Sequence, residues 1–334
     1  RRAREAVGMM PTALVTGAGG FIGSHLVEAL VRAGTRVRAL VHYNSAGRRG
    51  HLDDLPGDLL ADVEIIAGDV ADAACFQAAV QGCTHVYHLA ALIGIPYSYR
   101  APESYVRTNV VGTLNVLEAC RAAGVGRLIH TSPSEVYGSP RTIPIEESHP
   151  LHPQSPYAAT KSAADMLALS YHASFRLPVT VIRPFNTSGP RQSARAVIPT
   201  VVMQAVTTGT VMLGAIDTIR DFLFVHDTVQ GFRAAGEAEG VDGEVIQLGT
   251  GIGTRIDALV ETVGDLLGRR LEVQTDPQRI RPAASEVDQL VCRADRARRL
   301  LGWEPRVDLR AGLNHTIAWL QDHLERYRAA EYAV

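Results

Sequence analysis

Cysteine is scarce in this sequence, and the few cysteines present never form a CxxC pair. The 334 residues contain four of them, Cys75, Cys83, Cys120 and Cys292, which lie far apart along the chain. Disulfide-rich secreted domains and structural zinc sites need closely spaced cysteines. The spacing therefore argues against a disulfide framework or a zinc site, and it favours reduced thiols in a cytoplasmic protein.

An excess of charge of one sign and long hydrophobic runs are also absent. The 33 Lys and Arg residues nearly balance the 35 Asp and Glu residues, and no basic stripe interleaved with aromatic residues occurs. Nucleic-acid binding is therefore not expected as a main function. No segment reaches the roughly 18 apolar residues of a membrane helix, so no membrane role is expected. The basic start, residues 1–11, lacks a following apolar region and is expected to be a flexible tail.

The chain does contain a regular alternation of short apolar runs and helical periodicity. Apolar runs indicate strands over residues 13–16, 37–41, 63–66, 85–90, 127–131 and 179–182. Helical spacing indicates helices over residues 21–33, 73–80, 106–123 and 157–175. This alternation predicts an α/β fold whose parallel sheet is covered on both faces. The last third mixes short strands with helices over residues 256–267, 294–301 and 309–329, which predicts a smaller C-terminal α/β lobe.

A glycine-rich loop, TGAGGFIG over residues 16–23, separates the first expected strand from the first expected helix. In such a loop one glycine permits a tight turn, another lets the backbone approach a pyrophosphate, and a third allows close packing of the helix on the sheet. The loop predicts a dinucleotide site formed by Gly17, Gly20, Phe21, Ile22 and Gly23. We therefore expect a Rossmann-like, doubly wound parallel sheet over residues 12–182. The substrate-binding lobe is expected mainly over residues 183–334, interleaved with that sheet.

The acidic residue that usually follows the second strand of this fold, and that holds the adenosine ribose, is missing. The strand ends in LVHYNS, residues 40–45, and Arg48 and Arg49 follow. We expect Asn44 to contact the cofactor, with NAD favoured and NADP left open. Asp69 and Val70 follow the third strand, where the carboxylate is expected near the adenine amine; a helix N-cap is an equally good interpretation.

Tyr157 and Lys161 are four residues apart on an expected helix and so share one face. An exposed amphipathic pair is the alternative, but the dinucleotide loop upstream favours chemistry. A free tyrosine has a pKa near 10, and lowering it by about three units takes roughly 4 kcal/mol of favourable charge. A lysine ammonium and a cationic nicotinamide together supply charge of that sign. Tyr157 would then take a proton from a substrate hydroxyl.

Several further motifs accompany the loop and the tyrosine–lysine pair: HLAA at residues 88–91, SPSEVYG at 132–138, RPFN at 183–186 and RDF at 220–222. With them, the chain from about residue 12 to about residue 325 resembles the extended short-chain dehydrogenase/reductase family of nucleotide-sugar epimerases and dehydratases. The segments at residues 90–99 and 183–195 are similar to the NAD-dependent 4,6-dehydratases related to legionaminic-acid biosynthesis. The resemblance implies cofactor contacts from Leu89, Ala90, Ala91 and Ser132. It also implies a homodimer whose interface includes the helix that carries Tyr157.

The stretch HTSPSEVYG, residues 130–138, departs from the pattern of this family. The family strand at this place ends in a hydroxyl residue that hydrogen-bonds the reacting sugar oxygen, and in 4,6-dehydratases an acid and a glutamate follow. Those positions are Pro133, Ser134 and Glu135 here. Proline donates no hydrogen bond, so either Ser132 or Ser134 takes over, or the site handles its sugar differently.

The resemblance implies two reactions and the residues favour one of them. Oxidation at C4 acidifies the C5 hydrogen and makes the C6 hydroxyl a leaving group, and Glu135 is suited to remove the C5 proton. A 4-epimerase has no need of Glu135, so a 4,6-dehydratase is favoured over an epimerase. A non-catalytic, dinucleotide-sensing protein is a third possibility; Pro133 argues for it, whereas Tyr157 and Lys161 argue against it.

A nucleoside-diphosphate sugar needs cationic groups for its phosphates, and arginine matches phosphate geometry well. By the resemblance, Asn186, Arg220 and Arg281 are expected contacts, with Arg191 and Arg279 as weaker candidates. A solvated surface role remains the alternative for any single arginine. His149 and His152 lie on a proline-rich loop with no further ligand at suitable spacing, so no metal site is expected.

Overall fold

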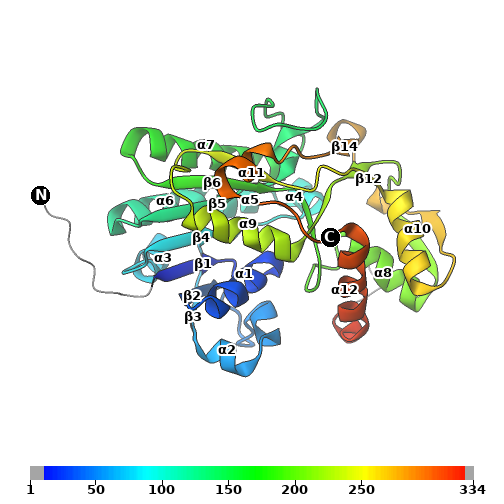
Figure 1. Cartoon of the computed structure of the whole chain (residues 1–334), viewed down its shortest axis with the longest axis horizontal. Helices are drawn as coiled ribbons and strands as arrows, with labels where there is room; N and C mark the ends of the chain where they lie inside the picture. The colour runs from blue at the N-terminus through cyan, green and yellow to red at the C-terminus, as the bar shows by residue number, and fades with distance from the viewer. Residues whose placement is uncertain (1–10, 328–334) are drawn as a thin grey trace, which may run out of the picture.

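The computed structural model of the protein describes residues 11–327 (Figure 1). The tail expected over residues 1–11 therefore lies, apart from its last residue, outside the described residues. No helix between residues 11 and 327 is long and apolar enough to cross a membrane.

Seven parallel strands form the main sheet, in the order β11-β6-β5-β4-β1-β2-β3. They are β1 (Thr12–Thr16), β2 (Arg36–Val41), β3 (Val63–Ala67), β4 (His85–His88), β5 (Arg127–Thr131), β6 (Val179–Pro184) and β11 (Val245–Leu248). Chain order runs outward in both directions from the junction of β1 and β4. Such a switch point opens a crevice at the carboxyl ends of the strands, where ligands bind in this fold. The expected doubly wound parallel sheet is therefore confirmed.

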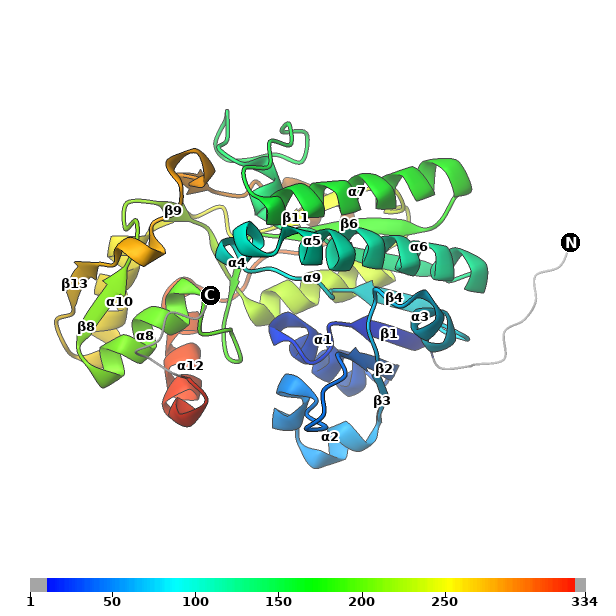
Figure 2. The same cartoon turned by 180° about the vertical axis from the view of Figure 1, so that it is seen from behind.

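Helices cover both faces of the sheet, as Figures 1 and 2 show. One face carries α1 (Phe21–Arg32), α9 (Val225–Glu237) and α11 (Asp295–Leu301), and the other carries α3 (Ala73–Ala79), α6 (Gly112–Ala123) and α7 (Pro156–Phe175). Alternate residues of β1 enter opposite cores: Ala13 and Val15 pack on the α1 side, whereas Leu14 packs on the α6 side. Burial on both faces explains why the centre of this strand, residues 13–15, is apolar without interruption.

The helix expected over residues 106–123 begins differently from a regular α-helix. Helices α4 (Ile95–Arg100) and α5 (Pro102–Tyr105) precede a π-helical turn over Val106–Val111, and α6 follows. Asn109 in this turn donates to the Leu92 carbonyl at 3.0 Å and accepts from the Leu92 amide at 2.9 Å. A second proton of the Asn109 amide goes to Thr160 Oγ1 at 3.1 Å. The turn therefore fixes the segment that follows β4 against α7.

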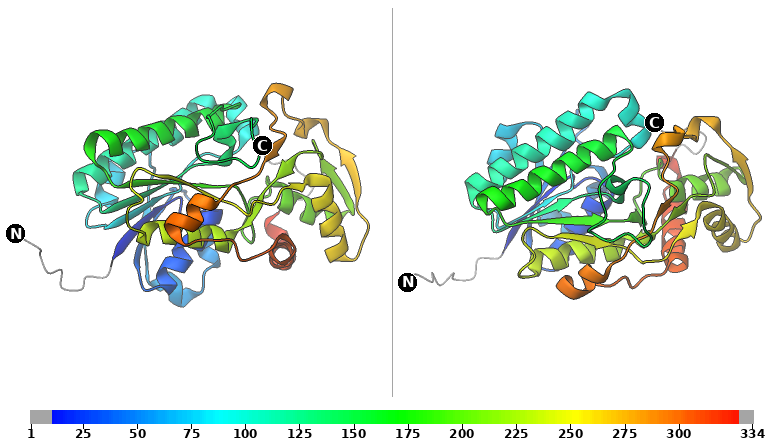
Figure 3. Two further views of the ribbon diagram at one scale, coloured as in Figure 1. Left: turned by 45° about the horizontal axis from the view of Figure 1, so that its top comes forward. Right: turned by 90° about the horizontal axis from the view of Figure 1, so that it is seen from above.

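The smaller part of the molecule lies beside the carboxyl ends of the main strands (Figure 3). Its helices α8 (Val197–Thr207), α10 (Ile256–Leu267) and α12 (Leu309–Gln321) enclose a separate core with the parallel pair β8 (Thr210–Leu213) and β13 (Glu272–Thr275). Two further small sheets pair β7 (Asn186–Ser188) with β10 (Phe222–Phe224), and β9 (Ile219–Arg220) with both β12 (Thr254–Arg255) and β14 (Gln289–Leu290).

Short elements complete the chain: η1 (Gly50–Asp54), α2 (Gly57–Ala61), η3 (Ser134–Tyr137), η4 (Pro277–Arg279), η5 (Ala283–Ser285) and η6 (Leu324–Arg326). The helix expected over residues 309–329 ends at Gln321, so that expectation was too long within the described residues. The expected boundary between the two lobes, at residues 182 and 183, stays a prediction. Three elements that follow it belong to the main part of the molecule: β11 is a strand of the main sheet, and α9 and α11 pack on that sheet.

Candidate active site

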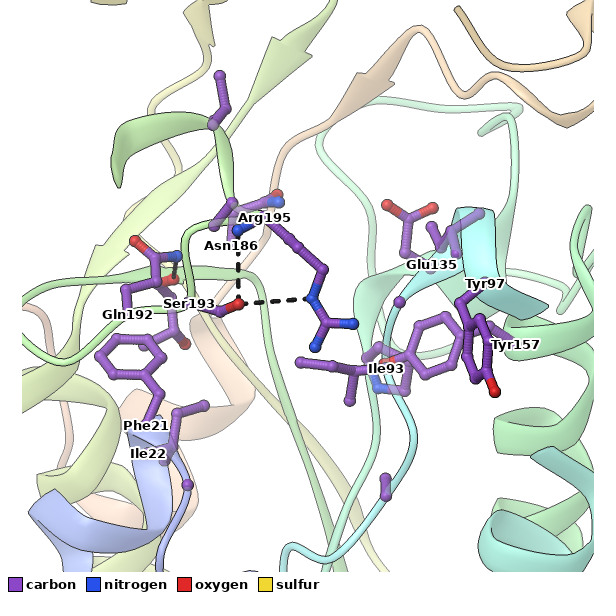
Figure 4. Close-up of a pocket in the computed structure, with 18 of the residues that line it drawn as sticks. Phe21, Ile22, Ile93, Tyr97, Glu135, Tyr157, Asn186, Gln192, Ser193 and Arg195 are labelled. Atoms are coloured by element: carbon purple, nitrogen blue, oxygen red, sulfur yellow. Dashed lines mark hydrogen bonds between the residues drawn. The ribbon is translucent and has the colours of Figure 1, made fainter. Parts of the chain in front are cut away.

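A cavity of about 1150 Å³ opens at the carboxyl ends of the central strands, between the main sheet and the smaller part. Its walls include the glycine loop, the segments after β2, β4 and β5, the start of α7, and the segments around β7 and β9 (Figure 4). Most of the predicted site residues line it: Gly17, Gly20, Phe21, Ile22, Gly23, Asn44, Leu89, Ala90, Ala91, Ser132, Ser134, Glu135, Tyr157, Lys161, Asn186, Arg220, Arg279 and Arg281. Asp69, Val70 and Arg191 are not among the lining residues.

The glycine loop closes tightly onto its neighbours. Gly17 has a φ of 65°, and a Cβ there would lie 2.9 Å from the Ala90 amide nitrogen. A Cβ on Gly23 would clash with the Gly17 carbonyl oxygen. Thr16 Oγ1 accepts hydrogen bonds from the amides of Leu89 and Ala90, at 3.1 and 3.0 Å. These contacts leave a cradle without side chains at the N-terminus of α1, which fits the pyrophosphate of a dinucleotide.

The three predicted residues that do not line the cavity make contacts within the protein. Asp69 Oδ1 accepts from the Ala71 amide at 2.8 Å, within its own turn, and Val70 is buried against Gly112. Arg191 Nη2 lies 3.0 Å from Glu28 Oε2, an ion pair that ties the loop after β7 to α1. Their roles in ligand binding stay predictions, and the contacts just described favour structural roles.

Tyr157 and Lys161 lie on the first two turns of α7, whose N-cap Ser155 accepts from the Ala158 amide at 3.1 Å. Tyr157 packs edge-on against the ring of Tyr105, with 6.3 Å between centroids. Burial raises the pKa of the Tyr157 phenol far above its usual value, and the nearby charge of Glu135 raises it further. The protein's own groups thus act opposite to the expected lowering, because loss of water around the phenolate and the nearby negative charge of Glu135 both disfavour ionisation.

A buried ionic cluster lies behind Lys161. Asp165, one turn further along α7, is fully buried and lies 2.7 Å from Arg183 Nη2 and 3.2 Å from His130 Nε2. Burial by itself raises the pKa of Asp165, but Arg183, His130 and Lys161 together hold it at about 2. Burial lowers the pKa of Lys161 to about 8, while the charge of Asp165 acts in the opposite direction. Asp165 therefore helps to keep the lysine protonated.

The same cluster distinguishes the two serines that flank Pro133. Ser132 Oγ donates its proton to Asp165 Oδ2 at 2.6 Å and accepts from Arg183 Nε at 3.1 Å. Ser134 also lines the cavity, and its hydroxyl has no hydrogen-bond partner between residues 11 and 327. Ser134 is thus the hydroxyl whose proton is free for a ligand, while the proton of Ser132 is committed.

Glu135 follows Ser134 in η3 and faces the cavity on the same side as Tyr157 (Figure 4). Its carboxylate has no hydrogen-bond or ion-pair partner in the described part of the chain. Figure 4 also shows Arg195 reaching toward this side from the opposite wall, and an Arg195 nitrogen would lie 3.2 Å from a Cβ on Gly94. A half-buried, unpaired carboxylate beside a buried tyrosine is a candidate proton acceptor.

The far end of the cavity is cationic. Arg220 is buried, and Glu286 links it to Arg281: Glu286 Oε1 lies 3.4 Å from Arg220 Nη2 and 3.5 Å from Arg281 Nη1. Burial lowers the pKa of Arg220, although the charge of Glu135 opposes this. Asn186 Oδ1 is buried without a hydrogen-bond partner among the described residues. This wall can therefore bind phosphate oxygens through the two arginines.

Sequence reasoning missed Asp165, Arg183 and Arg195 as parts of the site. Asp165 carried a usable signal, because its spacing of four from Lys161 places it on the same face of the expected helix. Arg183 is the charged residue of a strand, VTVIRP, whose other residues are apolar apart from Thr180, which is a second signal. Nothing in the local sequence indicates that Arg195 crosses the cavity.

Three comparisons place the chain among known proteins. The family model described as GDP-mannose 4,6 dehydratase matches residues 14–316. The dTDP-glucose 4,6-dehydratase of Streptomyces antibioticus is 35% identical over 318 residues, covering 93% of this chain and 92% of the relative. The UDP-glucose 4-epimerase of Mycolicibacterium smegmatis is also 35% identical, over 323 residues that cover 92% of this chain and 98% of the relative. Dehydratases and epimerases are thus equally similar to it.

Solved structures show the same pair of activities. The dTDP-glucose 4,6-dehydratase DesIV of Streptomyces venezuelae, determined with NAD and TYD, superimposes with a TM-score of 0.85 at 30% identity and covers 96% of this chain and 100% of its own. The UDP-glucuronic acid 4-epimerase of Bacillus cereus, determined with UDP-glucuronic acid and NAD, has a TM-score of 0.85 at 27% identity and covers 93% and 99%. The chain therefore belongs to the extended short-chain dehydrogenase/reductase family, in its branch of nucleotide-sugar dehydratases and epimerases.

Proposed function

We propose that the protein is a nucleotide-sugar 4,6-dehydratase that uses NAD. The observation that supports dehydration over epimerisation is the unpaired carboxylate of Glu135, which lines the cavity beside Ser134 and Tyr157. Removal of the C5 proton requires such a base, whereas epimerisation at C4 does not. Similarity to relatives does not decide, because the two activities occur at equal identity.

The residues divide the reaction between them. The glycine loop would hold NAD, and the bound cofactor would supply hydride exchange with the sugar, from C4 in the oxidation and to C6 in the reduction. Tyr157 removes the proton of the C4 hydroxyl, and Ser134 donates a hydrogen bond to the same oxygen. Lys161 places a positive charge behind the tyrosine. Glu135 takes the proton from C5 and transfers it to the C6 hydroxyl, which leaves as water. When hydride reaches C6, C5 takes up one proton from solvent through Glu135, and this uptake balances the proton that Tyr157 removed from the C4 hydroxyl and releases to solvent.

The diphosphate of a nucleoside-diphosphate sugar carries negative charge that complements the arginines on the far wall of the cavity. In this proposal Arg220 and Arg281 bind the diphosphate, and Asn186 donates a side-chain N–H to it. Arginine pairs with phosphate in a two-point geometry that lysine lacks. The four free thiols support a reducing compartment, so we place the reaction in the cytoplasm.

A 4-epimerase is the second candidate. The specific observation in its favour is Ser134, which occupies the position where a dehydratase would have an acid to protonate the leaving hydroxyl. In that case Tyr157 and Ser134 act at C4 in both directions, and Glu135 serves only as a charged group in the cavity wall.

Mass spectrometry of products distinguishes these reactions. The purified protein is incubated with UDP-, dTDP-, GDP- and CDP-sugars, with NAD or NADP added. We expect one sugar nucleotide to lose the mass of one water. An isomer of unchanged mass would make the protein an epimerase, and no product together with no reduced cofactor would support a dinucleotide-sensing protein.

We also propose that two copies of the chain pair through α6 and α7. Apolar side chains stay exposed on these helices and on the π turn: Val106 (48% exposed), Val111 (40%), Leu114 (37%) and Met166 (50%). Exposed apolar residues on neighbouring helices favour a protein contact, and a two-fold pair would bury them. Size-exclusion chromatography with light scattering should give twice the 36.0 kDa chain mass.

Substitutions test which face is used. Leu114→Glu with Met166→Glu should halve the measured mass, because buried acidic groups without partners oppose association. Val273→Glu, which changes an exposed apolar residue on β13, is the matched control and should leave the mass unchanged. A monomeric wild-type protein at micromolar concentration would contradict the proposal.

A further inference from the structure

A segment of the smaller part, residues 277–286, lines one wall of the cavity and is called the strap below. It lies between β13 and β14 and contains the short turns η4 and η5. Arg281 and Glu286 of the strap line the cavity. Little apolar side-chain area anchors the strap, since Ile280 is 55% exposed and residues 282–284 are exposed as well. Polar contacts therefore set its position.

The tip of the strap is bonded to the main part of the molecule, at the start of α7. Ser285 Oγ donates to the Gln154 carbonyl at 2.6 Å, and Gln154 Nε2 donates to the Ala284 carbonyl at 2.9 Å. Gln154 directly precedes Ser155, the N-cap of α7, and Tyr157 lies in the first turn of that helix. Two hydrogen bonds thus connect the strap to the segment that leads into the tyrosine helix.

A third contact to the tip comes from α4. Tyr99 Oη lies 2.5 Å from Ser285 Oγ. Because the single hydroxyl proton of Ser285 goes to the Gln154 carbonyl, the Tyr99 hydroxyl is the donor here and Ser285 is the acceptor. The Ser285 hydroxyl therefore joins the strap to α4 and to the loop before α7 at the same time. We call the contacts among Tyr99, Gln154 and Ser285 the tie.

The strap residues on either side of the tip belong to the cationic wall of the cavity. Arg281 precedes η5 and Glu286 follows it. Glu286 Oε1 lies 3.5 Å from Arg281 Nη1 and 3.4 Å from Arg220 Nη2, which comes from β9. The tie fixes the tip between these two strap residues to the start of α7. It thereby sets where Arg281 stands relative to Tyr157.

We infer that Tyr99, Gln154 and Ser285 are positioning residues for substrate binding. Through the tie, Arg281 is held at the diphosphate of the ligand while Tyr157 acts on its sugar. Pre-arranging the groups that bind both ends of one ligand lowers the ordering cost of binding. The inference rests on the proposed function in one respect, the binding of a nucleoside diphosphate by Arg281, and it holds for either sugar reaction.

Hydrogen–deuterium exchange of the unliganded protein tests the tie itself. Ser285→Ala should speed exchange of the strap amides about tenfold, because it removes two of the three hydrogen bonds of the tip. Ser285→Thr, which keeps a hydroxyl, should restore the protection. Thr262→Val removes a hydroxyl from α10, in the same part of the molecule, and is the matched control that should leave the strap unchanged. Exchange that stays the same in Ser285→Ala would overturn the tie.

Isothermal titration calorimetry with UDP, dTDP, GDP and CDP tests the effect on ligand binding without turnover. We expect at least one of them to bind, and Ser285→Ala to weaken its binding about tenfold while NAD binds the nucleotide-free protein as before. Equal weakening of NAD binding would overturn the positioning role. If none of the four bound the unaltered protein, the diphosphate wall of the proposed function would be wrong, and the role of the tie in binding with it.

A double variant tests whether the tie acts through Arg281. Arg281→Ala should weaken the same diphosphate about tenfold, and adding Ser285→Ala should weaken it little further, because the tie then has no guanidinium to position. Full additivity of the two losses would overturn the action through Arg281. In turnover, Ser285→Ala should raise KM for the sugar nucleotide about tenfold and leave kcat within about twofold. A fall in kcat with KM unchanged would contradict a role in binding.

Discussion

Glutamine in place of Glu135 is expected to stop loss of water while C4 oxidation continues, so that reduced cofactor accumulates on the enzyme. The amide cannot accept the C5 proton, and Glu135 is the unpaired carboxylate that faces the cavity beside Tyr157. Removing a general base typically lowers the rate by about 10²–10⁴-fold. Near-ultraviolet absorbance of the bound cofactor reports the oxidation, and mass spectrometry of the quenched sugar reports the water loss.

Tyr157→Phe is the matched contrast, because it acts on the earlier step. Without the phenol no group accepts the C4 hydroxyl proton, so the bound cofactor stays oxidised and neither reaction proceeds. Each substitution keeps the side chain close to its original size. A difference in activity between the two variants therefore reflects the lost chemical group and not a change in packing. Unchanged product formation in Glu135→Gln would show that the dehydratase role of this glutamate is wrong.

The Glu135 variant also carries a pH signature. The negative charge of Glu135 adds to burial in raising the pKa of Tyr157. A neutral glutamine removes that contribution, so the pKa of Tyr157 falls and the phenolate persists to lower pH. The acid limb of C4 oxidation, followed by cofactor absorbance, should therefore move to lower pH in Glu135→Gln.

Local spacing predicted the parts of the molecule that depend on neighbours in sequence. The glycine loop and the Tyr157–Lys161 pair lie where strand–loop–helix periodicity places them, and the cavity brings them together. Helix α9 (Val225–Glu237) was not predicted, because Gly231 and Gly236 interrupt its pattern. In the structure these glycines allow close contact: a Cβ on Gly231 would meet Leu248, and one on Gly236 would meet Tyr87. These contacts are tertiary, so the local sequence does not indicate them.

The open choice between Ser132 and Ser134 shows the same limit within the site. Both are hydroxyls beside Pro133, and no local rule separates them. The difference arises from Asp165 and Arg183, which are 33 and 51 residues from Ser132 and engage its hydroxyl. Only the assembled sheet and α7 bring these groups together.

Asp165→Asn is expected to produce the largest loss of stability. Asp165 and Arg183 are both fully or almost fully buried, and the change leaves the guanidinium without its counter-charge. Breaking a buried pair from one side typically costs about 3–5 kcal/mol. Urea denaturation measures the free energy of unfolding. Glu237→Gln, which alters an exposed carboxylate at the end of α9, is the control and should change it little.

The double variant Asp165→Asn with Arg183→Met separates charge from packing, since it removes both members of the pair. Stability should recover in part, because no buried charge is then left alone.

The alkaline limb of the pH profile of cofactor reduction gives an independent readout. In the single variant, burial and Arg183 lower the pKa of Lys161 below its value of about 8, since the opposing charge of Asp165 is gone. Lys161 then loses its proton at lower pH, and the limb moves to lower pH. In the double variant Arg183 no longer lowers that pKa, so the limb should move part of the way back. A limb that stays fixed in all three proteins would show that Asp165 stabilises the fold without setting the charge of the lysine.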